Sequence, residues 1–142
     1  MLVRTAVALA TGSVLLSLAA PVAAQSTATT AAAGAGPSFT EAQAVQGEIV
    51  YKRACSACHQ IRDHSNEDFR FNWKGRSVLE LFNTIRNTMP EETPGSLAPQ
   101  QYADIVAYMM KVNGIAAGPR PLLPDTAALR ATRFHVKDAR QK

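Results

Sequence analysis

Two cysteines and a histidine lie within five consecutive residues, Cys55-Ser56-Ala57-Cys58-His59, and the chain contains no further cysteine. Thiols three positions apart on one turn of a helix can reach the two vinyl groups of a single porphyrin and form thioethers. The imidazole that directly follows the second thiol is then carried beneath the ring, where one of its nitrogens can bind iron. This C-x-x-C-H pattern predicts one covalently attached haem c per chain, held by Cys55, Cys58 and His59.

Three other uses of the same residues fit the pattern less well. A structural disulfide between Cys55 and Cys58 would close only a very short loop and would leave His59 without a role. A thioredoxin-like redox pair would need a βαβ setting, and the sequence has no β-rich stretch. A zinc site would need further ligands, and no second cysteine pair supplies them. Haem attachment is therefore the favoured interpretation.

A methionine is the candidate for the second axial ligand of the iron. Met89 lies in a segment bounded by prolines, residues 87–95, where its side chain has no evident packing role. A thioether is a soft ligand that raises the reduction potential of haem iron. Met109 and Met110, by contrast, lie on the apolar face of a predicted helix and suit ordinary core packing. We therefore predict that His59 and Met89 bind the metal.

The other potential ligands are two histidines outside the motif. His64 lies in a polar segment, residues 62–68, and is predicted to be a surface residue. His135 lies in the basic C-terminal part of the chain. Either residue could displace Met89 only in an alternative state of the protein.

The elements that must position these residues are helices. Residues 40–43 have the spacing of a capping box and predict a first helix that runs through Gly47 and Tyr51 into the haem motif. Residues 77–80 repeat this spacing and predict a second helix. The buried face of that second helix is expected to consist of Val78, Phe82 and Ile85.

A third helix is predicted from Pro99, a residue suited to the first helical position, to the stop at Asn113-Gly114. Its apolar stripe consists of Tyr102, Ile105, Val106, Met109 and Met110. Gly47 costs the first helix about 1 kcal/mol relative to alanine, so we expect the third helix to approach it closely. No strand is indicated, and the predicted fold is a small all-α domain with three main helices around a covalently attached haem.

Composition divides the chain into four parts. Residues 1–24 combine a basic start, an uncharged apolar run and small residues before Gln25, which predicts a cleaved signal peptide; an uncleaved anchor is the alternative. Residues 25–38, rich in Ala, Thr, Ser and Gly, predict a linker. Residues 39–118 are predicted to form the folded domain, and residues 119–142 a basic C-terminal tail. Export agrees with thioether attachment, which in bacteria takes place outside the cytoplasm, and predicts a periplasmic protein.

The formal net charge of +4 is concentrated at the C-terminal end. Residues 41–118 carry eight Lys/Arg and nine Asp/Glu, whereas residues 119–142 carry six Lys/Arg and two Asp/Glu. The basic residues are not interleaved with aromatic residues on a structured face, so we do not expect nucleic acid as a partner. The tail is either a solvated segment or a contact for a partner protein or a membrane surface.

With these residues in place, residues 44–114 resemble the class I monohaem cytochromes c. The likeness rests on the haem motif, on Met89 before a proline, and on Gly47 and Tyr51 in the first helix. The resemblance implies that the first helix contacts the C-terminal helix of the domain near Tyr108.

The resemblance also implies roles for two residues between the first and second helices. Trp73 would pack along the haem edge near a propionate, and Arg76 would neutralise that propionate. One feature departs from the family, because no proline lies between His59 and Met89. In the family a proline carbonyl commonly accepts a hydrogen bond from the proximal imidazole. The acceptor for His59 is therefore open.

A narrower likeness covers residues 88–118, which are similar to cytochromes c associated with bacterial quinoprotein dehydrogenases. It implies a periplasmic one-electron carrier, and not an enzyme. Its redox partners would be a dehydrogenase as donor and an oxidase or another cytochrome of the respiratory chain as acceptor. Two alternatives stay open. One is a tightly bound electron-transfer subunit of a dehydrogenase complex, docked through the basic tail, and the other is a haem protein with an open sixth site.

Overall fold

A computed structural model describes residues 39–136 of the 142-residue chain. The predicted signal peptide, the predicted linker and the last six residues lie outside this range. The elements are helices: α1 (Glu41–Ala54), the 3-10 helix η1 (Ile61–His64), α2 (Glu67–Trp73), α3 (Val78–Thr88), α4 (Pro99–Val112) and α5 (Thr126–Ala131). Within residues 39–136 the only β pairing is an isolated bridge between Ser77 and Arg133. The prediction of an all-α domain is confirmed.

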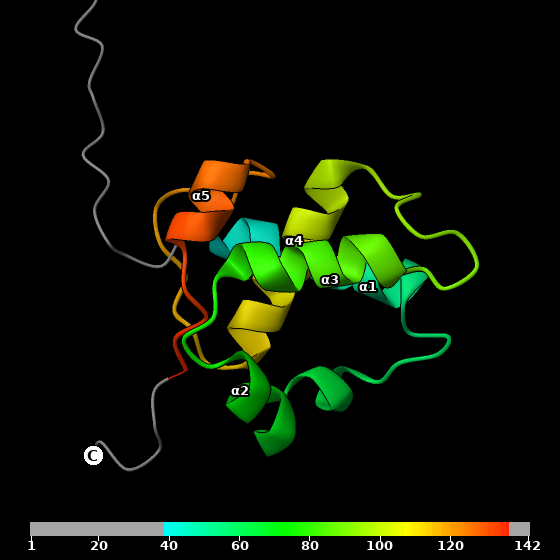
Figure 1. Ribbon diagram of the computed structural model, residues 1–142, viewed down its shortest axis with the longest axis horizontal. Coiled ribbons are helices and arrows are strands. Elements are labelled where there is room, and N and C mark those ends of the chain that lie inside the picture. The colour runs from blue at the N-terminus through cyan, green and yellow to red at the C-terminus, as the bar shows by residue number, and fades with distance from the viewer. Residues whose placement is uncertain (1–38, 137–142) are drawn as a thin grey trace, which may run out of the picture. The chain divides into compact units, whose positions relative to one another are not determined.

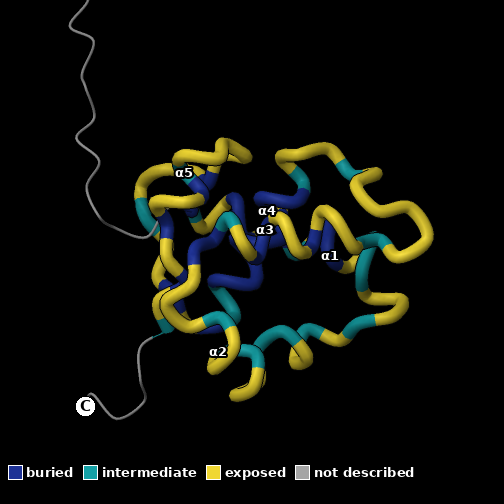
Figure 2. Tube along the Cα trace, viewed as in Figure 1, coloured by how far each residue is buried: buried dark blue, intermediate teal, exposed yellow. Residues whose placement is uncertain are grey.

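Helix α4 is the centre of the core, and α1 and α3 both pack against it (Figure 1). Its residues 102–110 are all buried, and the tube of Figure 2 is dark blue along most of this helix. The predicted apolar stripe of the helix is therefore correct, but burial extends around its circumference. Helices α1 and α3 pack against it, and Leu122 contacts its first turn at Gln100.

The contact between α1 and α4 is as close as the glycine in α1 predicts. A Cβ atom added at Gly47 would lie 1.8 Å from the carbonyl oxygen of Asp104 and 3.0 Å from Cβ of Tyr108. One turn further along α1, the ring of Tyr51 meets the ring of Tyr108 edge-on, with 5.7 Å between the centroids. The absence of a side chain at Gly47 thus lets the two helix backbones touch.

The three main helices begin where the sequence predicts. The hydroxyl of Thr40 accepts the backbone N–H of Gln43 at 3.1 Å and caps α1. Ser77 and Glu80 form a capping box at the start of α3. Helix α4 has Pro99 at its first position, and no hydroxyl is available at its N-cap, Ala98. The side chain of Gln101 instead accepts the Ala98 backbone N–H at 3.0 Å.

Helices η1 and α2 occupy a stretch that the sequence predicts to be a polar connection. The side chain of Asn66 caps α2 by accepting the Phe69 N–H at 2.8 Å. Neither helix has a fully buried residue. In Figure 1 the segment that contains them lies on one side of α1, α3 and α4, so it can form one wall of a site without joining the core.

The C-terminal residues differ most from the prediction. Residues 119–136, here called the C-terminal segment, are packed on the helical core, whereas the sequence predicts a tail from residue 119 onward. Leu122, Leu129 and Phe134 are almost completely buried, and α5 packs on α3. The folded unit therefore does not end at residue 118, because three large apolar side chains among the basic residues belong to the core.

A buried amide ties the C-terminal segment to α1. The side chain of Gln43 accepts the backbone N–H of Leu122 at 2.7 Å and donates to the Leu122 carbonyl at 2.7 Å. Its nitrogen also donates to the carboxylate of Asp104 at 2.9 Å, and Gln100 donates to the same carboxylate oxygen at 2.8 Å. The polar groups enclosed between α1, α4 and the C-terminal segment are thus paired with one another.

Replacing Gln43 with alanine is expected to destabilise the domain by about 2 kcal/mol, because it leaves the N–H of Leu122 buried without a partner and removes one of the two amide donors to the Asp104 carboxylate. The neighbouring exposed Gln46→Ala is the matched control and should leave stability nearly unchanged. Thermal unfolding of the two variants, followed by circular dichroism, measures the difference. Equal unfolding midpoints would contradict the role given to Gln43.

Candidate haem site

The cysteine-histidine motif lies in a turn directly after α1. Helix α1 ends at Ala54, and the backbone N–H groups of Cys58 and His59 both donate to the carbonyl of Cys55, at 3.2 and 2.9 Å. The motif therefore continues one further turn beyond the helix instead of lying on it. The two thiols can still reach a single porphyrin, as predicted for a helical turn, because Cys55 and Cys58 line the same cavity.

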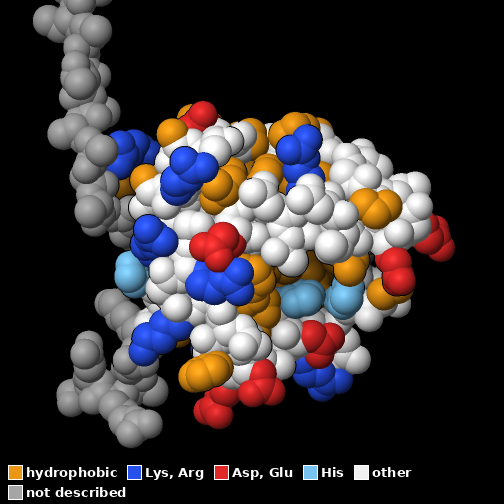
Figure 3. All heavy atoms as spheres, viewed as in Figure 1, with side chains coloured by type: hydrophobic (Ala, Val, Ile, Leu, Met, Phe, Trp, Pro, Cys, Tyr) orange, Lys and Arg blue, Asp and Glu red, His pale blue; other side chains and the backbone are white. Residues whose placement is uncertain are grey.

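This cavity has a volume of about 520 Å³ and is lined from every main element of the fold. Its volume lies within the range of cofactor sites in proteins, roughly 300–1,000 Å³. Five of the six predicted cofactor-binding residues line it: Cys55, Cys58, His59, Trp73 and Met89. Figure 3 shows histidine side chains next to one another in this hollow, with hydrophobic side chains around them. Residues predicted from the sequence to bind one cofactor thus lie around one cavity, although they come from separate elements of the fold.

The inner wall of the cavity is apolar. Leu81 and Ile85 from α3 and Ile105 and Met109 from α4 line it, and all four side chains are buried. Met109 belongs to the stripe predicted for core packing, and the structure places it at the boundary between core and cavity. A wall of this kind keeps water away from a flat apolar ligand.

Three hydrogen bonds fix the backbone of Met89, the C-cap residue of α3. Its N–H donates to the Ile85 carbonyl at 2.8 Å. Its carbonyl accepts the hydroxyl of Tyr102 at 2.8 Å and the N–H of Gly95 at 3.3 Å. Tyr102 is completely buried. Sequence reasoning assigns Tyr102 to the core and misses its second role, the support of the Met89 turn.

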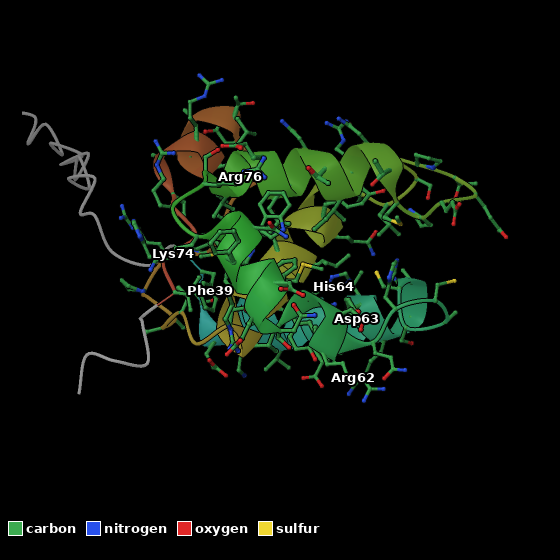
Figure 4. The ribbon with its side chains drawn as sticks, turned by 60° about the horizontal axis from the view of Figure 1, so that its bottom comes forward. Phe39, Arg62, Asp63, His64, Lys74 and Arg76 are labelled. Atoms are coloured by element: carbon green, nitrogen blue, oxygen red, sulfur yellow. The ribbon has the colours of Figure 1, made fainter. Side chains whose placement is uncertain are left out.

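Trp73 and Arg76 have different relations to the cavity. Trp73 is half-buried and lines it. The guanidinium of Arg76 lies over the Trp73 ring, 4.4 Å from its centroid, and its Nε donates to the carboxylate of Glu80 at 2.7 Å. Arg76 is exposed near the start of α3 and is not among the residues that line the cavity (Figure 4). Its contact with a propionate stays a prediction.

His64 is not the surface residue that the sequence predicts. It is half-buried and lines the cavity, with its ring centroid 5.2 Å from that of His59 and 5.7 Å from that of Phe69 (Figure 4). Burial, and then the neighbouring His59, lower the pKa of His64. Helix η1 turns the side chain inward, and the side-chain amide of Asn113 donates to the His64 carbonyl at 2.7 Å. His135, by contrast, is exposed.

Tyr51 contributes a polar atom that lacks a partner. Its hydroxyl is buried, and it makes no hydrogen bond within the part of the chain that the structure describes. Burial raises the pKa of Tyr51 to about 12. Tyr51 lines the cavity beside the motif, and its ring centroid lies 5.9 Å from that of His64. Buried polar groups in folded proteins are almost always paired, so this hydroxyl is an exception that needs an explanation.

The residues around the cavity fit a haem c. Two free thiols with the attachment spacing, an imidazole and a thioether share one cavity with an apolar wall. Burial raises the pKa of the Cys55 thiol, whereas Cys58 is exposed at the rim. Among residues 39–136, no three His, Cys, Asp or Glu side chains are grouped so that they could hold a metal ion.

Comparison with known families agrees with this geometry. The family model for subunit III of the cbb3-type cytochrome c oxidase matches residues 42–109. The match runs from the beginning of α1 to Met109 in α4 and includes the cysteine-histidine motif, Trp73 and Met89. No curated protein and no solved structure matches the chain. Residues 42–109 therefore form a cytochrome c domain, whose role is haem-based electron transfer and not enzymatic catalysis.

Proposed function

We propose that this chain is an exported one-electron carrier that accepts electrons from a quinoprotein dehydrogenase and passes them to the respiratory chain. The observation that carries the proposal is the shared cavity of Cys55, Cys58, His59 and Met89. These residues come from the turn after α1 and from the end of α3, and the cytochrome c domain accounts for both.

Each residue of the cavity has a task in such a carrier. Haem c, when bound, supplies one-electron exchange between ferrous and ferric iron. Cys55 and Cys58 would hold it covalently, and His59 and Met89 would both bind its iron, which would leave no position for a substrate. Tyr102 holds the Met89 turn in place. The apolar wall from α3 and α4 excludes water and so favours the less charged, reduced state of the site.

The proposed periplasmic location and the proposed electron donor, a quinoprotein dehydrogenase, are supported by the sequence alone. Residues 1–24 have the composition of a signal peptide, and a periplasmic location would supply the setting in which bacterial thioethers form. Residues 88–118 are similar to cytochromes c that accompany quinoprotein dehydrogenases. Within residues 39–136, no helix is long and apolar enough to cross a membrane.

A second candidate is an electron-transfer subunit held permanently in a complex. The matching family model describes an oxidase subunit, and this favours a role inside an assembly. Residues 119–136 of the segment predicted as a basic docking tail are packed on the domain, so docking through them would use the surface of the folded domain, where Arg120, Arg130 and Arg133 are exposed. Size-exclusion chromatography of the native protein separates the two candidates, because a free carrier elutes as a protein of 15.2 kDa or less.

The proposed function is tested by mixing the oxidised protein with a quinoprotein alcohol dehydrogenase and its alcohol in a stopped-flow spectrophotometer. We expect rapid reduction that requires both enzyme and alcohol, followed by reoxidation on addition of an oxidised respiratory cytochrome. The reduced protein should not bind carbon monoxide, because His59 and Met89 would both bind the iron. Carbon monoxide binding would contradict the carrier and favour a haem protein with an open sixth site.

A further inference from the structure

An imidazole that binds iron through one nitrogen carries a proton on the other nitrogen. That N–H normally donates to a carboxylate, a carbonyl or a water, and this hydrogen bond orients the ring and raises the basicity of the ligand. His59 lies at the end of the motif turn, and its own backbone N–H is used by the Cys55 carbonyl. The acceptor for the ring N–H of His59 is therefore either a group on a neighbouring element or a water.

The ring of His64 is the polar group that η1 places against the ring of His59. The centroids are 5.2 Å apart and the planes are inclined by 51°. No hydrogen bond joins the two rings in this arrangement, but at this separation a rotation of the rings to edge-to-edge would bring two nitrogens within hydrogen-bond distance. The position of His64 is fixed from several directions. Asn113 binds its carbonyl at 2.7 Å, and the rings of Tyr51 and Phe69 lie edge-on to it, with centroids 5.9 and 5.7 Å away.

Two other acceptors in and beside η1 each already accept one hydrogen bond. The carboxylate of Asp63 accepts the backbone N–H of Gln60 at 2.8 Å, which closes the η1 turn. The His64 carbonyl accepts from Asn113. A neutral imidazole offers one acceptor nitrogen and one N–H, so His64 could accept from His59 and donate to a further group. Tyr51 lines the same cavity, and its ring centroid lies 5.9 Å from that of His64. Its buried hydroxyl makes no hydrogen bond in this arrangement, so a rotation of the His64 ring is needed to make the hydroxyl that group.

We propose that His64 is a positioning residue that accepts the free ring N–H of His59 and donates its own ring N–H to the hydroxyl of Tyr51. The chain Tyr51–His64–His59 connects α1, η1 and the motif turn. It gives the buried hydroxyl a partner and holds the iron-binding imidazole in one orientation. This inference rests on the proposed role of His59 as a haem ligand.

The test uses the full-length haem-loaded protein and three variants. His64→Phe keeps an aromatic ring but removes the acceptor, His64→Gln keeps an acceptor, and Tyr51→Phe removes only the outer hydroxyl. Histidine-labelled protein in the reduced state is measured by NMR for exchange of the His59 ring proton with solvent, and each reduction potential is determined. We expect exchange about tenfold faster in His64→Phe and near the wild-type rate in His64→Gln.

The potential separates a positioning role from mere packing. Loss of the acceptor makes His59 a less basic ligand, so His64→Phe should raise the potential, His64→Gln should restore it, and Tyr51→Phe should have a smaller effect in the same direction. If His64→Phe changed neither the exchange rate of the His59 ring proton nor the reduction potential, the inference about His64 would be overturned, and the proposed function would stand. A wild-type chain without attached haem would overturn the proposed function, and the inference with it.

Discussion

Replacing Met89 with alanine is expected to abolish the sulfur-to-iron charge-transfer band of the oxidised protein and to lower its reduction potential. The fall should be on the order of 100 mV, since axial ligands together set haem potentials over a range of about 0.8 V. The physical reason is the loss of a soft thioether, which favours ferrous iron. Optical spectra of the oxidised protein and a potentiometric titration measure both effects.

Met109 provides the matched control for this prediction. It is the other methionine that lines the cavity, and it is buried on α4. Met109→Leu removes its sulfur with little change of volume, so the band and the potential should stay close to those of the wild type. The reverse result, with the band lost in Met109→Leu and kept in Met89→Ala, would show that the axial ligand is assigned to the wrong residue.

Tyr102 offers a milder variant of the same site. Tyr102→Phe deletes the hydroxyl that binds the Met89 carbonyl and leaves the ring in the core. If this hydrogen bond holds the turn, the charge-transfer band should remain but disappear at a lower temperature than in the wild type. An unchanged transition temperature would mean that the other backbone hydrogen bonds of Met89 suffice.

Replacing Gly47 with alanine is expected to cost about 4 kcal/mol of stability, an exceptional value for the addition of one methyl group. The added Cβ would lie 1.8 Å from the Asp104 carbonyl oxygen, and this neighbour is backbone that cannot rotate away. Alanine's better helix propensity offsets only about 1 kcal/mol. Helix α1 would have to move away from α4, and the motif turn at its end would move with it.

Thermal unfolding of the haem-loaded protein measures this cost. For a domain of this size, a loss of about 4 kcal/mol corresponds to a fall in the unfolding midpoint of roughly 20 °C. Gln46→Ala, one position earlier on the exposed side of α1, is the control and should unfold close to the wild type. A Gly47→Ala protein as stable as this control would contradict the close packing of α1 on α4.

The sequence predicts well what is encoded locally. The capping residues Thr40 and Ser77 and the proline at position 99 mark the starts of α1, α3 and α4, because their effect depends only on neighbours within one turn. The cysteine-histidine motif is equally local. Met89 could be selected because Pro90, which directly follows it, disfavours a helical conformation at Met89.

Long-range contacts account for what the sequence does not predict. The partners of Leu122 are on Gln43, 79 positions away, so nothing near residue 122 indicates that the C-terminal segment is part of the core. The hydroxyl of Tyr102 likewise binds the carbonyl of Met89, which lies 13 positions earlier in the chain. For His64 a local signal exists, since Asn66 followed by two acidic residues is a helix start. A prediction that included α2 would have left only a short connection between the motif and α2. Such a connection would favour a position of His64 close to the cavity.

The central claim is that this chain carries a haem attached through Cys55 and Cys58. Intact-mass spectrometry under denaturing conditions, on protein made in a bacterium that matures c-type cytochromes, tests it most directly. The account predicts a polypeptide mass increased by one haem, with the increase absent when both cysteines are replaced by alanine. A wild-type mass equal to that of the polypeptide alone would contradict it.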